Sequence, residues 1–110
     1  MNEDYEYNYA INKDINICFI SGIIITDIEF DFFYNSRKLT SKASFYIETE
    51  KGYNSSKNRT IEKIFIVAYN EKADLVYNYL EIGNYILIKG FLEQNRVVVD
   101  DIYKETNFSK

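Results

Sequence analysis

The sequence lacks several residue types on which protein chemistry commonly depends. Its 110 residues include no histidine, no proline and no tryptophan, and only one cysteine and four glycines. Without histidine, and with Cys18 as the single thiol, a disulfide framework, a zinc cluster and a Ser-His or Cys-His nucleophile pair are all excluded. We therefore expect no metal site, no cofactor and no enzymatic activity.

Long apolar runs are missing as well. No run reaches the roughly 18 residues that a membrane-spanning helix needs. The chain opens with the acidic and polar residues Met1 to Glu6 rather than with a secretory signal. We expect a soluble, cytoplasmic protein without a membrane partner. The composition, 46% hydrophobic and 27% charged, predicts one globular domain. We place it at residues 16–104, between a flexible acidic tail at 1–15 and a short tail at 105–110.

Alternating apolar residues predict strands in the first half of the domain. Residues 16–33 form a β-rich run that is too long for one straight strand, and Gly22 within it predicts a bend or bulge. The alternation breaks in 33–41, which we interpret as a loop. It resumes in 42–50, and 52–60 is a polar stretch typical of a flexible connection.

The second half contains the expected helix. A third strand at 62–69 precedes Asn70, whose side chain is a suitable N-cap for a short helix at 71–80. The apolar residues Ala73, Val76, Tyr77 and Leu80 share one helical face. Gly83 then provides the left-handed conformation that ends a helix.

Two further strands, at 85–92 and 96–103, are joined by a tight turn at 93–95. The predicted order is three strands, one helix and two strands, so that the helix lies between strands three and four. This is the layout of an all-β, five-stranded Greek-key OB-fold barrel. We expect inward-facing residues of the strands and helix to form its core. They are Ile20, Ile24, Phe45, Ile47, Val67, Val76, Leu80, Ile86, Ile88 and Val98.

Four stretches, at 22–30, 43–49, 67–69 and 73–92, resemble the bacterial single-stranded DNA-binding protein family. The last, ADLVYNYLEIGNYILIKGFL, is the most specific, because it looks like the family's helix, then Tyr-Leu-x-x-Gly, then a strand ending in Gly-x-Leu. The resemblance implies sequence-independent binding of single-stranded DNA in replication, recombination or mobile-element DNA processing. It also implies a homodimer or homotetramer. Replication or mobile-element proteins would be suitable further partners, although no residue pattern points to them.

The resemblance implies roles for individual residues and also shows departures from the family. Two of the family's base-stacking aromatic positions fall on Tyr53 and Tyr69, whereas a third falls on Lys63. The long hairpin that carries a further aromatic is reduced here to 93–95, and the family's acidic C-terminal tip has no counterpart in 106–110. These departures argue against a housekeeping role across a genome.

The charge distribution favours nucleic-acid binding independently of the resemblance. The net charge is −4, yet residues 37–63 carry seven cations against three anions, a net of +4. This segment covers the loops and strands with which OB-folds bind oligonucleotides, and its tyrosines offer flat faces for bases. The candidate nucleic-acid-binding residues are Arg37, Lys38, Lys42, Tyr46, Lys51, Tyr53, Lys57, Arg59, Lys63 and Tyr69.

Other interpretations of the same residues remain open. Each lysine or arginine could simply be solvated, and the tyrosines could pack within the barrel. Asp27, Glu29 and Asp31 alternate on one strand face and could bind Mg²⁺ for phosphodiester cleavage, but a nuclease would also need a general base and a shaped pocket. The main alternative function is an OB-fold protein-interaction module that has lost nucleic-acid binding, as the net acidity and missing stacking positions would allow.

Overall fold

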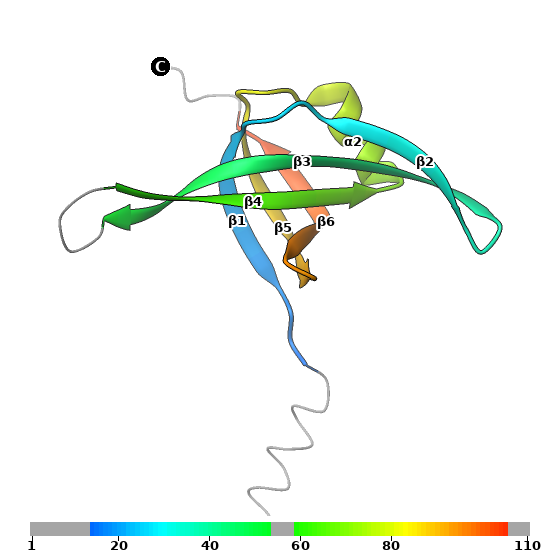
Figure 1. Cartoon of the computed structure of the whole chain (residues 1–110), viewed down its shortest axis with the longest axis horizontal. Helices are drawn as coiled ribbons and strands as arrows, with labels where there is room; N and C mark the ends of the chain where they lie inside the picture. The colour runs from blue at the N-terminus through cyan, green and yellow to red at the C-terminus, as the bar shows by residue number, and fades with distance from the viewer. Residues whose placement is uncertain (1–13, 54–58, 106–110) are drawn as a thin grey trace, which may run out of the picture.

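The computed structural model describes residues 14–53 and 59–105, which form six strands and one helix (Figure 1). The elements are β1 (Cys18–Ile24), β2 (Glu29–Asn35), β3 (Lys38–Tyr53), β4 (Arg59–Tyr69), α2 (Glu71–Tyr79), β5 (Tyr85–Glu93) and β6 (Arg96–Lys104).

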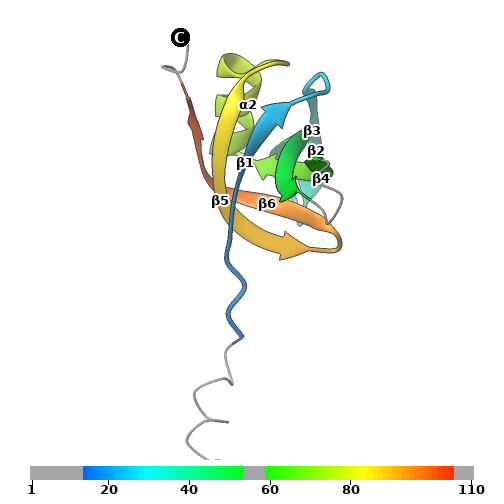
Figure 2. The same ribbon diagram turned by 90° about the vertical axis from the view of Figure 1, so that its left-hand side faces the viewer.

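Five of the strands close a ring. β1 pairs with β5, β5 with β6, β6 with β4, β4 with β3, and β3 again with β1, while β2 extends the sheet from the outer edge of β3. All of these pairings are antiparallel except that of β4 with β6. α2 connects β4 to β5 and lies at one end of the ring, opposite the β5–β6 turn (Figure 2). The predicted all-β OB-fold, with its helix between the third and fourth predicted strands, is confirmed.

The predicted loop at 33–41 is wrong, because this segment forms a hairpin. β2 pairs with β3 from Glu29↔Ser44 to Asn35↔Lys38, and only Ser36 and Arg37 lie between the strands. Both have positive φ, 54° and 72°, as expected in a two-residue type I′ turn. That turn usually contains Asn or Gly, so Ser-Arg gave no hairpin signal. The long run at 16–33 is thus divided between β1 and β2.

Other turns follow the sequence prediction more closely. Gln94 and Asn95, at φ 51° and 66°, form the tight turn between β5 and β6, and Gly83 has φ 96° in the turn after α2. Asn70 precedes the helix, but its side chain makes no capping hydrogen bond. The predicted side-chain cap is therefore wrong; instead, the Asn70 carbonyl accepts from the Asp74 N–H at 2.9 Å.

Two glycines allow strands to cross at close range. A Cβ atom on Gly22 would collide with the Glu48 carbonyl of β3, and one on Gly90 would collide with the Val98 carbonyl of β6. Gly22 lies just before the point where β1, still paired with β5 at Ile23, also pairs with β3 at Ile23 and Ile24. The β1–β5 register is continuous through Gly22, so the bend or bulge predicted there stays a prediction. Gly90 lies where the β5–β6 register shifts.

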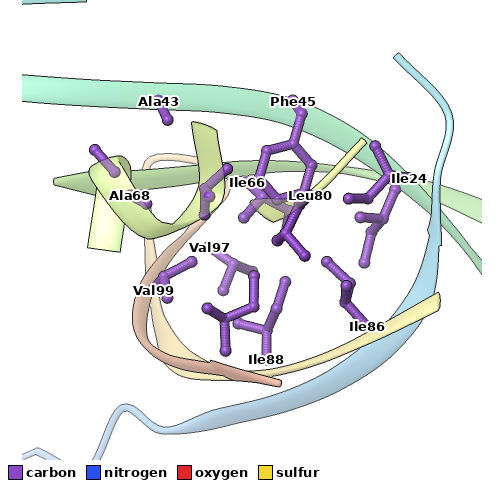
Figure 3. Close-up of a cluster of buried hydrophobic side chains, with 14 residues drawn as sticks. Ile24, Ala43, Phe45, Ile66, Ala68, Leu80, Ile86, Ile88, Val97 and Val99 are labelled. Atoms are coloured by element: carbon purple, nitrogen blue, oxygen red, sulfur yellow. The ribbon is translucent and has the colours of Figure 1, made fainter. Parts of the chain in front are cut away.

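The core fills the ring and continues under α2 (Figure 3). Of the ten predicted core residues, Ile20 is half-buried against the core and the other nine are buried. Val67 and Val98, however, lie outside the central cluster, which contains their neighbours Ile66 and Val97 instead. Because side chains alternate along a strand, Val67 and Val98 face outward. They are nevertheless buried, with exposed fractions of 0% and 6%.

Candidate nucleic-acid interface

The site is built on the outer face of β3, β4 and β6, which we define as the side turned away from the core. Ala43, Phe45 and Ile47 of β3 point inward, so the residues between them point outward. The same alternation applies to β4 and β6. The outer face so defined carries Lys42, Tyr46, Lys63, Phe65, Tyr69 and Arg96.

An aromatic pair occupies the middle of this face. Tyr46 and Phe65 are directly opposite each other in the β3–β4 ladder. Their ring centroids are 4.9 Å apart with an angle of 44° between the ring planes, and Tyr46 remains 42% exposed. Such cross-strand contact fixes ring orientation. The pair therefore presents a preorganised apolar surface to solvent.

A second aromatic contact lies at the end of β4. Tyr69 is half-buried, and its ring approaches that of Phe33 from β2 at a centroid distance of 6.3 Å and an angle of 71°. Tyr69 is also opposite Lys42 in the β3–β4 ladder. This end of the face thus combines two aromatic rings with a cation.

Arg96 extends across the outer face between these aromatic groups. Its backbone pairs with Phe65, while its Nη2 donates to the Tyr69 hydroxyl at 3.5 Å and lies 3.6 Å from Glu93 Oε1. Both distances exceed those of strong charge-assisted bonds, about 2.7–2.9 Å. Arg96 Nε is buried and has no hydrogen-bond partner within the described part of the chain. The guanidinium is therefore held in place but incompletely satisfied.

These groups converge on one shallow pocket, which we call the hairpin pocket. It lies where the β2–β3 hairpin meets β4 and β6. Its lining consists of Asp31, Phe32, Phe33, Lys42, Tyr69 and Arg96. Two cations, one carboxylate and the rings of Phe33 and Tyr69, from four different strands, are brought together there. Arrangements of this kind can hold phosphates and stack bases.

The predicted site residues are distributed unevenly over the structure. Lys42, Tyr46, Lys63 and Tyr69 share the outer face, whereas Arg37 and Lys38 are exposed at the tip of the β2–β3 hairpin. Lys63 also lines a second pocket, with Phe19 and Leu92. The backbones of Lys51, Tyr53 and Arg59 end β3 and begin β4, with Tyr53 opposite Arg59. Their side chains, and the whole of Lys57, lie outside the described residues, so their roles stay predictions.

Sequence reasoning missed Phe33, Phe65 and Arg96. Phe33 was assigned to a loop, and Arg96 lies outside the basic segment at 37–63. Only the parallel pairing of β4 with β6 brings Arg96 to the face. Phe65 could have been found, because it has the same strand parity as Tyr69, but the expectation that Val67 points inward obscured this.

The described part of the chain contains neither a metal cluster nor a membrane-spanning helix. No three His, Cys, Asp or Glu side chains there could hold a metal ion together. Asp27 precedes β2, so the acidic residues at 27, 29 and 31 do not all lie on one strand. Within residues 14–53 and 59–105, no helix is both long enough and apolar enough to cross a membrane.

The fold is similar to known structures. The SSB domain of a protein from Synechococcus sp. superposes with a TM-score of 0.65 at 13% identity, covering 83% of this chain and 97% of that one. The single-stranded DNA binding protein from Thermus aquaticus superposes with a TM-score of 0.69 at 14% identity, covering 86% of this chain and 52% of that one. No curated protein sequence matches the chain. The model of the single-strand binding protein family matches residues 15–108, and the chain therefore belongs to this family.

Proposed function

We propose that the protein binds single-stranded DNA through the outer face of β3, β4 and β6, without a strict sequence requirement. The observation that carries this proposal is the alignment of rings and cations on one face of an OB-fold. The Tyr46–Phe65 pair and Tyr69 offer stacking surfaces, and Lys42 and Arg96 line the pocket beside Tyr69. Family membership supports the same conclusion.

The net charge of −4 limits the electrostatic contribution to binding. Lys42, Lys63 and Arg96 on the outer face could neutralise three phosphates, with further contacts from the predicted loop cations. At about −0.7 per phosphate, the slope of log affinity against log salt should be roughly −2 to −3. Stacking must supply the rest, at about 1–3 kcal/mol per base.

The test is a fluorescence titration of the protein with oligo(dT) at several salt concentrations. We expect weak to moderate affinity and the shallow slope given above. Replacing both Tyr53 and Tyr69 with alanine should abolish measurable binding while circular dichroism shows that the fold is intact. A folded double variant that binds like the parent would place the interface elsewhere. A parent that fails to bind at low salt would overturn the proposal.

We further propose that the chain self-associates as a dimer or tetramer, in keeping with what the resemblance implies. Phe19 on β1 and Leu87 on β5 are exposed on the outer wall of these paired strands. Clustered apolar side chains of this kind mark interaction surfaces. Sedimentation should give a species larger than 13.1 kDa at micromolar concentration. A monomer at high micromolar concentration would contradict this. As part of the proposed binding of single-stranded DNA, we also propose a role in replication, recombination or mobile-element DNA processing.

A protein-interaction module is the second candidate function. It is favoured by exposed apolar residues on the other face of the β2–β3 hairpin, where Phe32 and Tyr34 are 63% and 73% exposed and Leu39 lies opposite Tyr34. This patch is distinct from Tyr46 and Phe65. Failure of oligo(dT) binding at low salt, with the fold intact, would favour this function.

A further inference from the structure

One residue of the hairpin pocket has the wrong charge for phosphate binding. Asp31 lines the pocket with Lys42, Tyr69 and Arg96 and is directly opposite Lys42 in the β2–β3 ladder. Within the described part of the chain, Asp31 has neither an ion pair nor a side-chain hydrogen bond. Its carboxylate is exposed and available to a ligand.

The charges of the pocket determine how a nucleotide can enter it. A phosphate beside Asp31 would be repelled, whereas the Arg96 guanidinium, whose Nη2 makes only long contacts to Tyr69 and Glu93, suits a phosphate. The Tyr69 and Phe33 rings line the same pocket and can contact the flat face of a base. The arrangement favours a nucleotide whose phosphate lies toward Arg96, on β6, and whose base edge faces Asp31, on β2.

An ionised carboxylate accepts hydrogen bonds and donates none. Cytosine presents an amino group at the position where thymine presents a carbonyl oxygen, and in single strands these edges are free to be read. We propose that Asp31 is a specificity-determining residue, which gives the hairpin pocket a preference for bases with an exocyclic amino group over thymine. This inference rests on the proposed binding of single-stranded DNA and adds a base preference to it.

The test is competition between oligo(dC) and oligo(dT) of equal length for the protein, at mildly alkaline pH so that cytosine tracts remain unfolded. We expect oligo(dC) to bind about three- to tenfold more tightly, because one exposed hydrogen bond gives less discrimination than a bidentate contact. In Asp31→Asn the preference should disappear, since an amide can both donate and accept. Oligo(dT) affinity should rise in this variant as the repulsion of phosphate is removed.

Glu29→Gln is the matched control. Glu29 lies on the same strand and the same face as Asp31, opposite Ser44, but it does not line the hairpin pocket. Both variants remove one negative charge, so both should raise general affinity slightly, and only Asp31→Asn should change the ratio between the two oligonucleotides.

The outcomes separate this inference from the proposed function. Oligo(dT) binding by the parent, without a preference for oligo(dC), would overturn the role of Asp31 and leave DNA binding in place. A preference that persists in Asp31→Asn, or that falls equally in Glu29→Gln, would also overturn it. If the parent binds neither oligonucleotide, both proposals fail.

Discussion

The two faces of β3 and β4 differ in what their side chains contact, although alternate residues of the same two strands form both faces. On the inner face Phe45, Ile47, Ile66 and Ala68 are almost fully removed from solvent and belong to the apolar core cluster. On the outer face Tyr46 keeps much of its ring exposed, and the cross-strand neighbours Tyr46 and Phe65 fix each other's orientation.

This difference separates stability from binding. Apolar burial on the inner face contributes to the free energy of unfolding in proportion to the area removed from water. The outer rings contribute less of it, because they stay partly exposed, and a ligand can still cover them. Substitutions on the inner face should therefore unfold the protein, and those on the outer face should weaken DNA binding in a folded chain.

The sharpest comparison uses two adjacent residues, Phe45 and Tyr46, which point to opposite faces. Phe45→Ala should lower the free energy of unfolding by about 3–5 kcal/mol, since it removes a large buried ring and leaves a cavity. Tyr46→Ala should lower it by about 0.2–1 kcal/mol, the range of a cross-strand pair. Urea denaturation followed by circular dichroism measures both. Equal losses would show that the two faces do not differ in this way.

The next comparison concerns Tyr69 and the contribution of its ring to binding. Tyr69→Ala should weaken oligo(dT) binding by about 1–3 kcal/mol, roughly ten- to hundredfold, because it removes one stacking surface. Tyr69→Phe keeps the ring and loses only the long contact between the hydroxyl and Arg96, so it should bind nearly as well as the parent. Fluorescence anisotropy measures these affinities. Equal losses in the two variants would assign the effect to the hydroxyl instead.

Alternation in the sequence was enough to predict the inner face, because burial there follows the period of two along each strand. The inward and outward faces of β4 and β6 were harder to predict from alternation, since adjacent residues are both buried in each strand. They are Ile66 and Val67 in β4, and Val97 and Val98 in β6. Placing Val67 inward would also place Tyr69 inward, and the structure resolves this conflict by turning both outward.

The candidate site was only partly predictable. Lys42, Tyr46 and Tyr69 were found from the basic segment and from the resemblance, but Phe33 was hidden by a turn without glycine or asparagine at its centre. Arg96 was hidden because it reaches the face through a short parallel pairing between strands far apart in the chain. The alternation of residues within one β-strand contains no information about which distant strand it pairs with.

The contribution of Arg96 can be separated from general charge by the salt dependence of binding. Arg96→Gln should reduce the slope of log affinity against log salt by about 0.7, the value for one phosphate contact on a single strand. Lys104→Gln makes the same charge change beside Leu75 and Tyr79 of α2, away from the outer face, and should leave the slope unchanged. Equal changes in both variants would mean that only net charge matters.

The smallest expected effect on DNA binding concerns the helix side of the β2–β3 hairpin, which should contribute to stability and not to binding. Tyr77 of α2 stacks on Phe30 of β2, with ring centroids 4.6 Å apart and an angle of 28° between the planes. Tyr77→Leu keeps an apolar side chain but removes this stack, so the free energy of unfolding should fall by about 0.5–1.5 kcal/mol. Oligo(dT) affinity should stay within about twofold of the parent, because stacking on bases requires rings on the outer face. A loss of affinity as large as that of Tyr69→Ala, in a variant that remains folded, would mean that DNA contacts the helix side and that the interface extends around the hairpin.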